Sequence, residues 1–262
     1  MVKIAKIDID YGKFTNGMKF AKFGLGKKTI LMILGGPGNS IPKGFILNIY
    51  MKPILPLLNS YTIYLLSRKS NLPEGYTTED MAKDCAEVIR QDFNGHIDVI
   101  IGIFYGGIIM QYFAALFPEL ASKHIILAAG HSVSEVGKKI DFKYAKHISQ
   151  GNYGKAFGTI AKGIYKPSFK QKLMSLVLRI FGSMIKEGES PTFKQDIMIE
   201  AYAELNHNGQ EILKQISVPI LLMNGDKDVY FPKSYMEETA ALIKECRLEL
   251  FPGKEHNGFQ GP

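Results

Sequence analysis

The fold of this 262-residue chain is decided by the stretch Gly102-Ile103-Phe104-Tyr105-Gly106-Gly107. It follows an apolar run at residues 97–101, which is typical of a buried parallel strand, and it precedes an apolar stretch of helical length. Glycines on both sides let the backbone turn tightly and let the helix pack close to the strand. The side chain at the apex, Phe104, has no lone pair. The stretch predicts a sharp strand-to-helix turn whose apex cannot act as a nucleophile.

Strands and helices alternate along most of the chain. We expect an antiparallel pair from residues 1–10 and 18–23, joined through Gly12 and Asn16-Gly17. Threonine followed by acids at residues 77–80 predicts the start of a helix. Further strands are expected at 29–34, 62–66, 97–101, 124–129, 218–223 and 247–251, and helices at 106–117 and 233–244. The alternation predicts an α/β fold with a mostly parallel, twisted sheet and helices on both faces.

The alternation stops at residues 131–207, which resemble a run of helices. We expect residues 1–130 and 208–262 to form one core domain and residues 131–207 to form a helical cap, or lid. A helix predicted over residues 171–185 has an apolar stripe that either packs on the core, which is the simpler expectation, or faces an apolar ligand. The stripe consists of Leu173, Leu176, Val177, Ile180, Phe181 and Met184, and Lys170, Lys172, Arg179 and Lys186 flank it, where they could meet a carboxylate or a lipid headgroup.

Charge and composition restrict the partners. The net charge is +7, but the basic residues gather between Lys138 and Lys186, where eleven Lys or Arg accompany one acid, Asp141. No nucleic-acid-binding motif accompanies them, so we expect no nucleic-acid partner. Two distant cysteines indicate neither a disulfide nor a zinc site, and no phosphate loop or metal-ligand spacing is present, so we expect no cofactor and no metal. No long apolar run and no secretory signal appear, so we expect a cytoplasmic protein without a stable membrane anchor.

Three more features follow predicted strands, where an open α/β sheet binds its ligand. They are a glycine-rich loop at residues 35–40, Asn-Gly-Asp-Lys-Asp at 224–228, and Pro-Gly-Lys-Glu-His at 252–256. With the turn at 102–107, their order resembles the α/β-hydrolase superfamily over nearly the whole chain: oxyanion loop, nucleophile turn, helical insertion, acid, histidine. The loop is similar to the H-G-G-P-G loop of the proline-iminopeptidase-like and small-ester branch, with Leu34 in place of the histidine.

The resemblance implies a role for each of these positions. Phe104 occupies the nucleophile position, and His256 is the expected base. Asp228, the second aspartate of G-D-x-D, is expected to orient the histidine in preference to Asp226. The expected oxyanion donors are the backbone N–H groups of Gly36 and Tyr105.

The nucleophile is the element that departs from the family pattern. Phe104 cannot attack a carbonyl, and in the geometry of the family the side chain of Tyr105 points away from the pocket. Ser40 and Ser67 lie on loops near strand ends and are the candidates for a relocated nucleophile.

Three functions stay open at this stage. The first is a protein of serine-hydrolase lineage, like a carboxylesterase or acyl hydrolase for small or apolar esters or amides, that is inactive because of Phe104. The alternative is a non-catalytic pseudoenzyme that binds a small molecule in an apolar pocket under the lid. A third is general-base chemistry that needs only His256 and Asp228, as in cofactor-free dioxygenase relatives. The oligomeric state is open.

Overall fold

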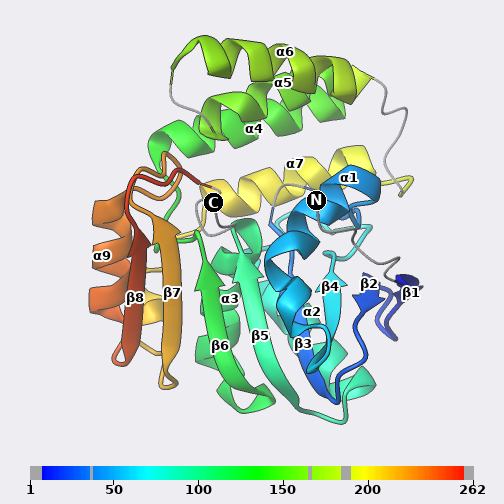
Figure 1. Cartoon of the computed structure of the whole chain (residues 1–262), viewed down its shortest axis with the longest axis vertical. Coiled ribbons are helices and arrows are strands. Elements are labelled where there is room, and N and C mark those ends of the chain that lie inside the picture. The colour runs from blue at the N-terminus through cyan, green and yellow to red at the C-terminus, as the bar shows by residue number, and fades with distance from the viewer. Residues whose placement is uncertain (1–7, 36–37, 165–166, 184–189, 257–262) are drawn as a thin grey trace.

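Eight strands form one sheet in the part of the chain that the computed structural model describes, residues 8–35, 38–164, 167–183 and 190–256. The strand order is β1-β2-β4-β3-β5-β6-β7-β8, and β3 to β8 are parallel (Figure 1). The mostly parallel sheet predicted from the sequence is confirmed. The strands are β1 (Asp10–Lys13), β2 (Lys19–Phe23), β3 (Lys28–Ile33), β4 (Tyr61–Leu66), β5 (Ile97–Ile103), β6 (Ala121–Leu127), β7 (Ile220–Gly225) and β8 (Cys246–Phe251).

The opening hairpin differs in part from the prediction. β1 begins only at Asp10, and residues 1–7 lie outside the described residues. Gly12, expected in the connection, lies within β1 opposite Phe20. The turn is made at Asn16-Gly17, where Gly17 has a φ of +86° and its N–H donates to the carbonyl of Phe14 at 2.8 Å. One Asn-Gly pair is enough to reverse the chain, so the hairpin needs no second glycine in the connection.

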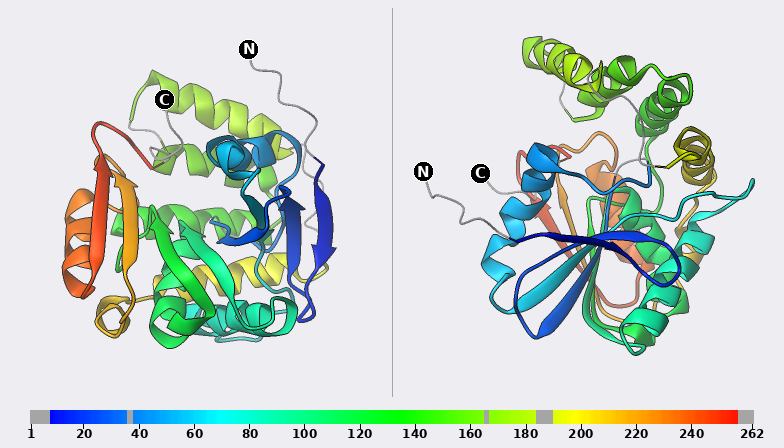
Figure 2. Two further views of the ribbon diagram at one scale, coloured as in Figure 1. Left: turned by 60° about the horizontal axis from the view of Figure 1, so that its bottom comes forward. Right: turned by 90° about the vertical axis from the view of Figure 1, so that its right-hand side faces the viewer.

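Helices cover both faces of the sheet, as predicted (Figure 2). α2, α3, α8 and α9 contribute to the larger apolar cluster on one face, and α1 with the 3₁₀ helix η1 contributes to the cluster on the other. α2 begins after Thr77, whose hydroxyl accepts from the Asp80 N–H while the Asp80 carboxylate accepts from the Thr77 N–H, each at 3.1 Å. The bounds are α1 (Gly44–Met51), η1 (Lys52–Leu57), α2 (Thr78–Asp92), α3 (Tyr105–Leu116), η2 (Pro118–Leu120), α8 (Gln210–Leu213) and α9 (Lys233–Leu242).

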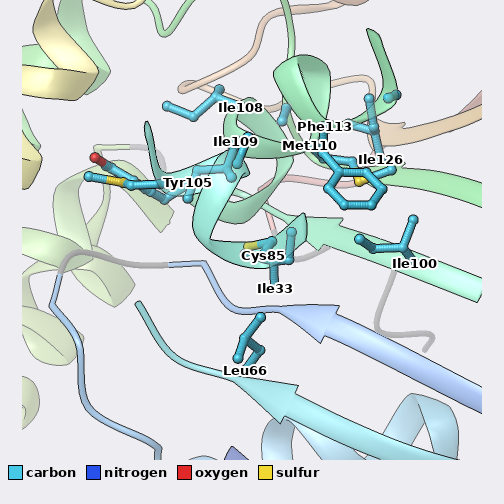
Figure 3. Packing of buried hydrophobic residues seen from close by; sticks show 14 of the residues in the cluster. Ile33, Leu66, Cys85, Ile100, Tyr105, Ile108, Ile109, Met110, Phe113 and Ile126 are labelled. Atoms are coloured by element: carbon cyan, nitrogen blue, oxygen red, sulfur yellow. The ribbon is translucent and has the colours of Figure 1, made fainter. Parts of the chain in front are cut away.

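α3 packs unusually close to the strands that precede it. A β-carbon on Gly106 would overlap the carbonyl oxygen of Ile33 in β3, and one on Gly102 would overlap the carbonyl oxygen of Gly106. Figure 3 shows α3 residues such as Ile109 and Phe113 beside the strand side chains of Ile33, Leu66, Ile100 and Ile126. The glycines of the deciding stretch therefore serve close packing, as the sequence predicted.

After β6, and before the short α8 that precedes β7, the described residues form four helices: α4 (Glu135–Ser149), α5 (Tyr153–Ile164), α6 (Phe169–Ser183) and α7 (Phe193–Leu205). They lie beyond the carboxyl ends of the parallel strands, and α6 is the outermost (Figures 1 and 2). We call residues 131–207 the helical insertion; that it is a separate cap domain stays a prediction. No helix in the described ranges is both long and apolar enough to span a membrane.

The prediction that the apolar stripe of α6 packs on the core is wrong. The side chains of the stripe are 39–57% exposed, and Met184 lies outside the described residues. The reason is that α6 uses its opposite face to contact α5. There the Ser175 hydroxyl donates to the Gly158 carbonyl at 2.7 Å, and a β-carbon on Gly182 would lie 2.7 Å from the Tyr153 carbonyl oxygen. Small residues make the closest contacts, and the ring of Phe181 meets that of Phe157 in α5 with centres 5.9 Å apart. The other large apolar side chains stay outside: Leu173, Leu176, Val177 and Ile180.

α7 directs three buried acids, spaced four residues apart, toward the core. The first, Asp196, accepts hydrogen bonds from the Leu72 N–H at 2.9 Å, the Asn39 side-chain amide at 2.7 Å and the Thr192 hydroxyl at 2.7 Å. Residues at i and i+4 lie on one face of a helix, so the next two acids face the same way. Asp196 thus fastens the insertion to the loops that follow β3 and β4.

The second acid, Glu200, forms a buried ion pair with Arg68. Its carboxylate lies 2.8 Å from Arg68 Nε, and both side chains are at most 2% exposed. Arg68 also donates to the carbonyls of Leu34 at 2.9 Å and Gly38 at 2.5 Å. Its guanidinium lies 4.6 Å above the centre of the Tyr105 ring. The pair therefore joins the ends of β3 and β4, the start of α3, and α7.

The third acid, Glu204, shares a hydrogen bond with Asp141 of α4. Burial raises the pKa of Asp141 to about 7, against the hydrogen bond from Tyr230 and the charge of His256, which lower it. Burial, together with the neighbouring Asp141, raises the pKa of Glu204 well above its ordinary value. The two carboxyl groups hold at least one proton between them near neutral pH, because two adjacent buried carboxylates cannot both ionise.

We expect Glu200→Ala to lower the free energy of unfolding by about 3–5 kcal/mol, because it leaves the Arg68 guanidinium buried without its carboxylate. The matched control is Glu211→Gln, which removes an ion pair of the same 2.8 Å length, to Lys214, from side chains that are 52–80% exposed. It should change the unfolding free energy by less than about 1 kcal/mol. Urea denaturation measures both. Equal changes in unfolding free energy would show that burial does not determine how much an ion pair contributes to stability.

The carboxyl pair makes stability depend on pH in a defined direction. The folded-state pKa of Asp141 lies above its ordinary value of 3.8, so folded protein retains a proton that unfolded chain releases. The stabilisation of the folded state by this proton is complete below about pH 4, and it is lost as the pH rises through about 7.

We therefore expect Asp141→Asn to make the decline of the unfolding free energy between pH 5 and pH 8 shallower, by about 1 kcal/mol per pH unit at most. Glu135→Gln, which changes an exposed acid of the same helix, is the control and should keep the wild-type slope. Urea titrations across this pH range provide the measurement. An unchanged slope in Asp141→Asn would mean that this carboxyl is already ionised in the folded protein.

Candidate active site

The turn between β5 and α3 holds Phe104 in a strained conformation. Its φ of +51° and ψ of −114° lie in a region that residues other than glycine rarely adopt, at a cost of about 1–3 kcal/mol. The Phe104 N–H donates to the Leu127 carbonyl at 2.9 Å, and its carbonyl accepts from Gly107 at 2.8 Å and Ile108 at 3.2 Å. The sheet and the helix thus determine the turn from both sides, whatever side chain stands at the apex.

Asp228 and His256 are brought together from the ends of β7 and β8. His256 Nδ1 lies 2.8 Å from an oxygen of Asp228, and both side chains are buried. The other oxygen of Asp228 accepts from the N–H groups of Tyr230 at 2.7 Å and Phe231 at 3.2 Å. A carboxylate can only accept, so Nδ1 carries a proton, and in the neutral imidazole Nε2 holds the lone pair of a base.

Asp226 has a different role from Asp228. It accepts from the Gly253 N–H at 2.7 Å, and this contact fastens the loop after β7 to the loop after β8. The structure therefore pairs His256 with Asp228.

The side chain of Phe104 lies against the histidine. The two rings stack with their centres 4.0 Å apart and their planes at 23°. Phe104 also contacts the loop after β3, since a β-carbon on Gly35 would lie 2.5 Å from the β-carbon and a ring carbon of Phe104. Tyr230 contacts the same histidine, with ring centres 4.6 Å apart. The benzyl group thus occupies space between the glycine-rich loop and the base.

Of the two expected oxyanion donors, Tyr105 lies among the described residues and Gly36 does not. Tyr105 is the first residue of α3, where a backbone N–H has no acceptor within the helix and can meet an anion. Its side chain is directed elsewhere: the hydroxyl donates to the Glu200 carbonyl at 2.8 Å. Burial raises the pKa of this hydroxyl well above its ordinary value, so it remains a neutral structural group.

The serines considered as replacement nucleophiles are not joined to the base. Ser67 is buried and donates to the Arg68 carbonyl at 3.1 Å. Within the described ranges, the hydrogen-bond partner of His256 is Asp228, and neither Ser40 nor Ser67 is bonded to it. The geometry thus gives neither hydroxyl the base that activation needs.

No sequence motif marks the charged groups around the site. Arg68, Glu200 and Glu204 carry no motif, although the four-residue spacing of the α7 acids was a signal that these polar residues share one face. Asp141 was visible as the one acid in a strongly basic segment. Its oxygen accepts from the Tyr230 hydroxyl at 3.0 Å, which links the carboxyl pair to the ring that contacts His256.

Solved structures with the same fold include several hydrolases. The chain matches an esterase from Thermogutta terrifontis with a TM-score of 0.67 and 18% identity, covering 98% of this chain and 93% of that one. An esterase from Exiguobacterium antarcticum gives 0.68 and 20%, covering 94% and 91%. A meta-cleavage product hydrolase from Pseudomonas fluorescens gives 0.69 and 15%, covering 95% and 91%. At these identities the likeness shows the fold alone.

Comparison with curated proteins gives no match. A family model described as the alpha/beta hydrolase fold matches residues 19–260. Together with the sheet order and the strand-to-helix turn at Phe104, this match confirms the resemblance seen in the sequence: the chain belongs to the α/β-hydrolase fold family.

Proposed function

We propose that this chain is an acyl-hydrolase-type α/β hydrolase in which Phe104 has removed the nucleophile and blocked the reaction space. One observation carries the proposal: a strained apex at φ +51° stacks directly on a histidine that an aspartate orients. The strained backbone at the apex gives a phenylalanine side chain no chemical function. The arrangement is the one that a nucleophile, its base and the acid that orients the base require.

Each retained part has a defined chemical use. With a hydroxyl at the apex, His256 Nε2 would accept its proton, and Asp228 would keep the other ring nitrogen protonated. The N–H of Tyr105 at the start of α3 would stabilise negative charge on the carbonyl oxygen of a substrate. The phenylalanine ring supplies neither a lone pair nor room for the carbonyl, so the chain as written forms no acyl-enzyme at this position.

The alternative is a non-catalytic protein that binds a small apolar or acyl ligand. The observation in its favour is that the Phe104 ring contacts both the Gly35 loop and His256. A closed aromatic wall of this kind suits binding without turnover. Ligand binding that persists while every restored variant stays inactive would favour this alternative.

We propose a small or apolar ester, amide or acyl ligand, because the solved structures of similar fold include two named as esterases. No nucleic acid is proposed as a partner, and a cytoplasmic location is part of the proposal.

The unmodified chain should not react with a fluorophosphonate probe, because no serine in the described ranges is hydrogen-bonded to His256. Intact-protein mass spectrometry after incubation measures the adduct. The variant Phe104→Ser is the positive control and should gain one equivalent. Stoichiometric labelling of the unmodified chain would show that another serine is activated.

Phe104→Ser should restore hydrolysis of p-nitrophenyl esters, because the turn, the base and the backbone donors do not depend on the side chain at the apex. Phe104→Ala is the matched control, since it opens the same space without adding a hydroxyl. We expect Phe104→Ser to exceed Phe104→Ala by at least about a hundredfold in kcat/KM. Both substitutions should cost a few kcal/mol of stability, as the loss of a packed ring does.

The double variant Phe104→Ser/His256→Ala tests whether the restored activity uses the base, and it should fall to the level of Phe104→Ala. If Phe104→Ser folds yet matches both controls across short and long acyl chains, the hydrolase lineage of the site is contradicted.

A further inference from the structure

The outer face of α6 is apolar and has no packing partner among the described residues. Phe169 is 82% exposed, and Leu173, Leu176, Val177 and Ile180 are 47–57% exposed. Their spacing places them along one side of the helix, away from Ser175, which bonds to α5. α6 is also the outermost element of the molecule (Figure 2). Exposed apolar patches of this kind mark interaction sites in soluble proteins.

Basic side chains border this apolar face. Lys172 and Arg179 lie along one side of α6 and Lys170 along the other. Arg179 also lines a hollow with Lys155 of α5 and Lys194 of α7, into which Leu176 and Ile180 of the apolar face extend.

The charge of the hollow is not compensated locally. Within the described ranges no acidic side chain forms an ion pair with Lys155, Arg179 or Lys194. Burial lowers the pKa of nearby His147, and the charges of Lys143 and Lys155 lower it further. The electrostatic potential at the hollow is therefore positive. The apolar face meets this cationic hollow along one edge of α6.

The one acid of the basic segment is turned away from this surface. Between Lys138 and Lys186 the single acid, Asp141, bonds to Tyr230 on the inner side of the insertion. A second copy of the chain is therefore a poor partner, because apposing two such faces would bring like charges together. Nucleic acid would match the charge but not the apolar centre of the surface. An anionic lipid bilayer matches both.

We propose that α6 docks this protein on membranes that contain anionic phospholipids. Its apolar face enters the interface between headgroups and acyl chains, with the helix lying parallel to the surface. Lys172 and Arg179 contact headgroup phosphates, and the hollow at Lys155, Arg179 and Lys194 receives one of them. This docking does not depend on the state of the active site, which lies on the other side of the insertion (Figure 1).

The experiment is flotation of the full chain with vesicles of phosphatidylglycerol and phosphatidylcholine, compared with vesicles of phosphatidylcholine alone. We expect binding to the anionic vesicles that is at least tenfold stronger and that weakens with salt. Lys155→Gln/Arg179→Gln should weaken it by about 25-fold, since each cation near such a surface contributes about fivefold. Leu176→Ser/Ile180→Ser should weaken it at least tenfold even at low salt.

Matched variants control for charge and for apolar exposure elsewhere. Lys214→Gln/Lys244→Gln removes two exposed cations far from α6, and Leu25→Ser removes a side chain that is 96% exposed. Both should bind as the unmodified chain does. Circular dichroism and urea denaturation establish that every variant is folded, which is expected because the substituted side chains are exposed.

Several outcomes would overturn the proposal. They are equal binding to both kinds of vesicle, binding that the α6 variants leave unchanged, and competition by millimolar inorganic phosphate at constant ionic strength, which would assign the hollow to a free anion. Concentration-dependent dimers in sedimentation velocity that Leu176→Ser/Ile180→Ser dissolves would assign the face to a second copy. Binding of a DNA duplex in preference to the anionic vesicles would assign it to nucleic acid.

Discussion

The buried ion pair between Arg68 and Glu200 is the interaction on which the arrangement around the site depends. A guanidinium out of water is tolerated only where each donor finds an acceptor. Here the acceptors come from two separate segments: the carbonyls of Leu34 and Gly38, before and within the glycine-rich loop, and the carboxylate of Glu200 on α7. Tyr105, at the start of α3, lies beneath the same guanidinium. The loop, the nucleophile turn and the insertion are therefore held by a single charged group.

The centre of the site and its surroundings differ in chemical character. The surroundings are polar and paired: an aspartate with both oxygens occupied, a histidine whose Nδ1 faces that aspartate, and a helix that starts at the apex. The centre has an aromatic ring that packs on the imidazole. Backbone strain at Phe104 persists because the glycine contacts of α3 with β3 and β5 require the turn, and this requirement is independent of the apex side chain.

The insertion distributes its residues in an unusual way. Asp141 of α4 and the acids of α7 point inward, where they pair with Arg68, Asn39 and one another, while α6 presents apolar side chains outward among cations. The inward acids are stable because each has a buried donor or shares a proton. The outward apolar face is permitted because α5 and α6 make their contact through glycine and serine. One segment thereby supplies both the polar support of the site and a surface suited to a bilayer.

Sequence by itself determined the sheet, the turn and the order of the site elements. Apolar runs, glycines on both sides of Phe104, and Asp228 and His256 after strands are local patterns, and parallel strands carry such ends to one edge. It also identified Asn16-Gly17 as a turn, but it placed Gly12 in the connection and the α6 stripe on the core. The spacing of apolar residues indicates that a helix has an apolar face, but it does not indicate which face a neighbouring element covers.

Tertiary structure alone decided the role of Arg68, Glu200, Glu204 and Asp141. Arg68 and Glu200 lie 132 residues apart in the chain, Asp141 and Glu204 lie 63 residues apart, and no local rule connects residues at such separations. The same holds for the contact of Phe104 with His256, which needs the ends of β5 and β8 to lie on one edge of the sheet. Local sequence fixes which conformations a segment prefers, but burial and pairing of charge are properties of segments brought together. They are therefore set only when the whole chain has folded.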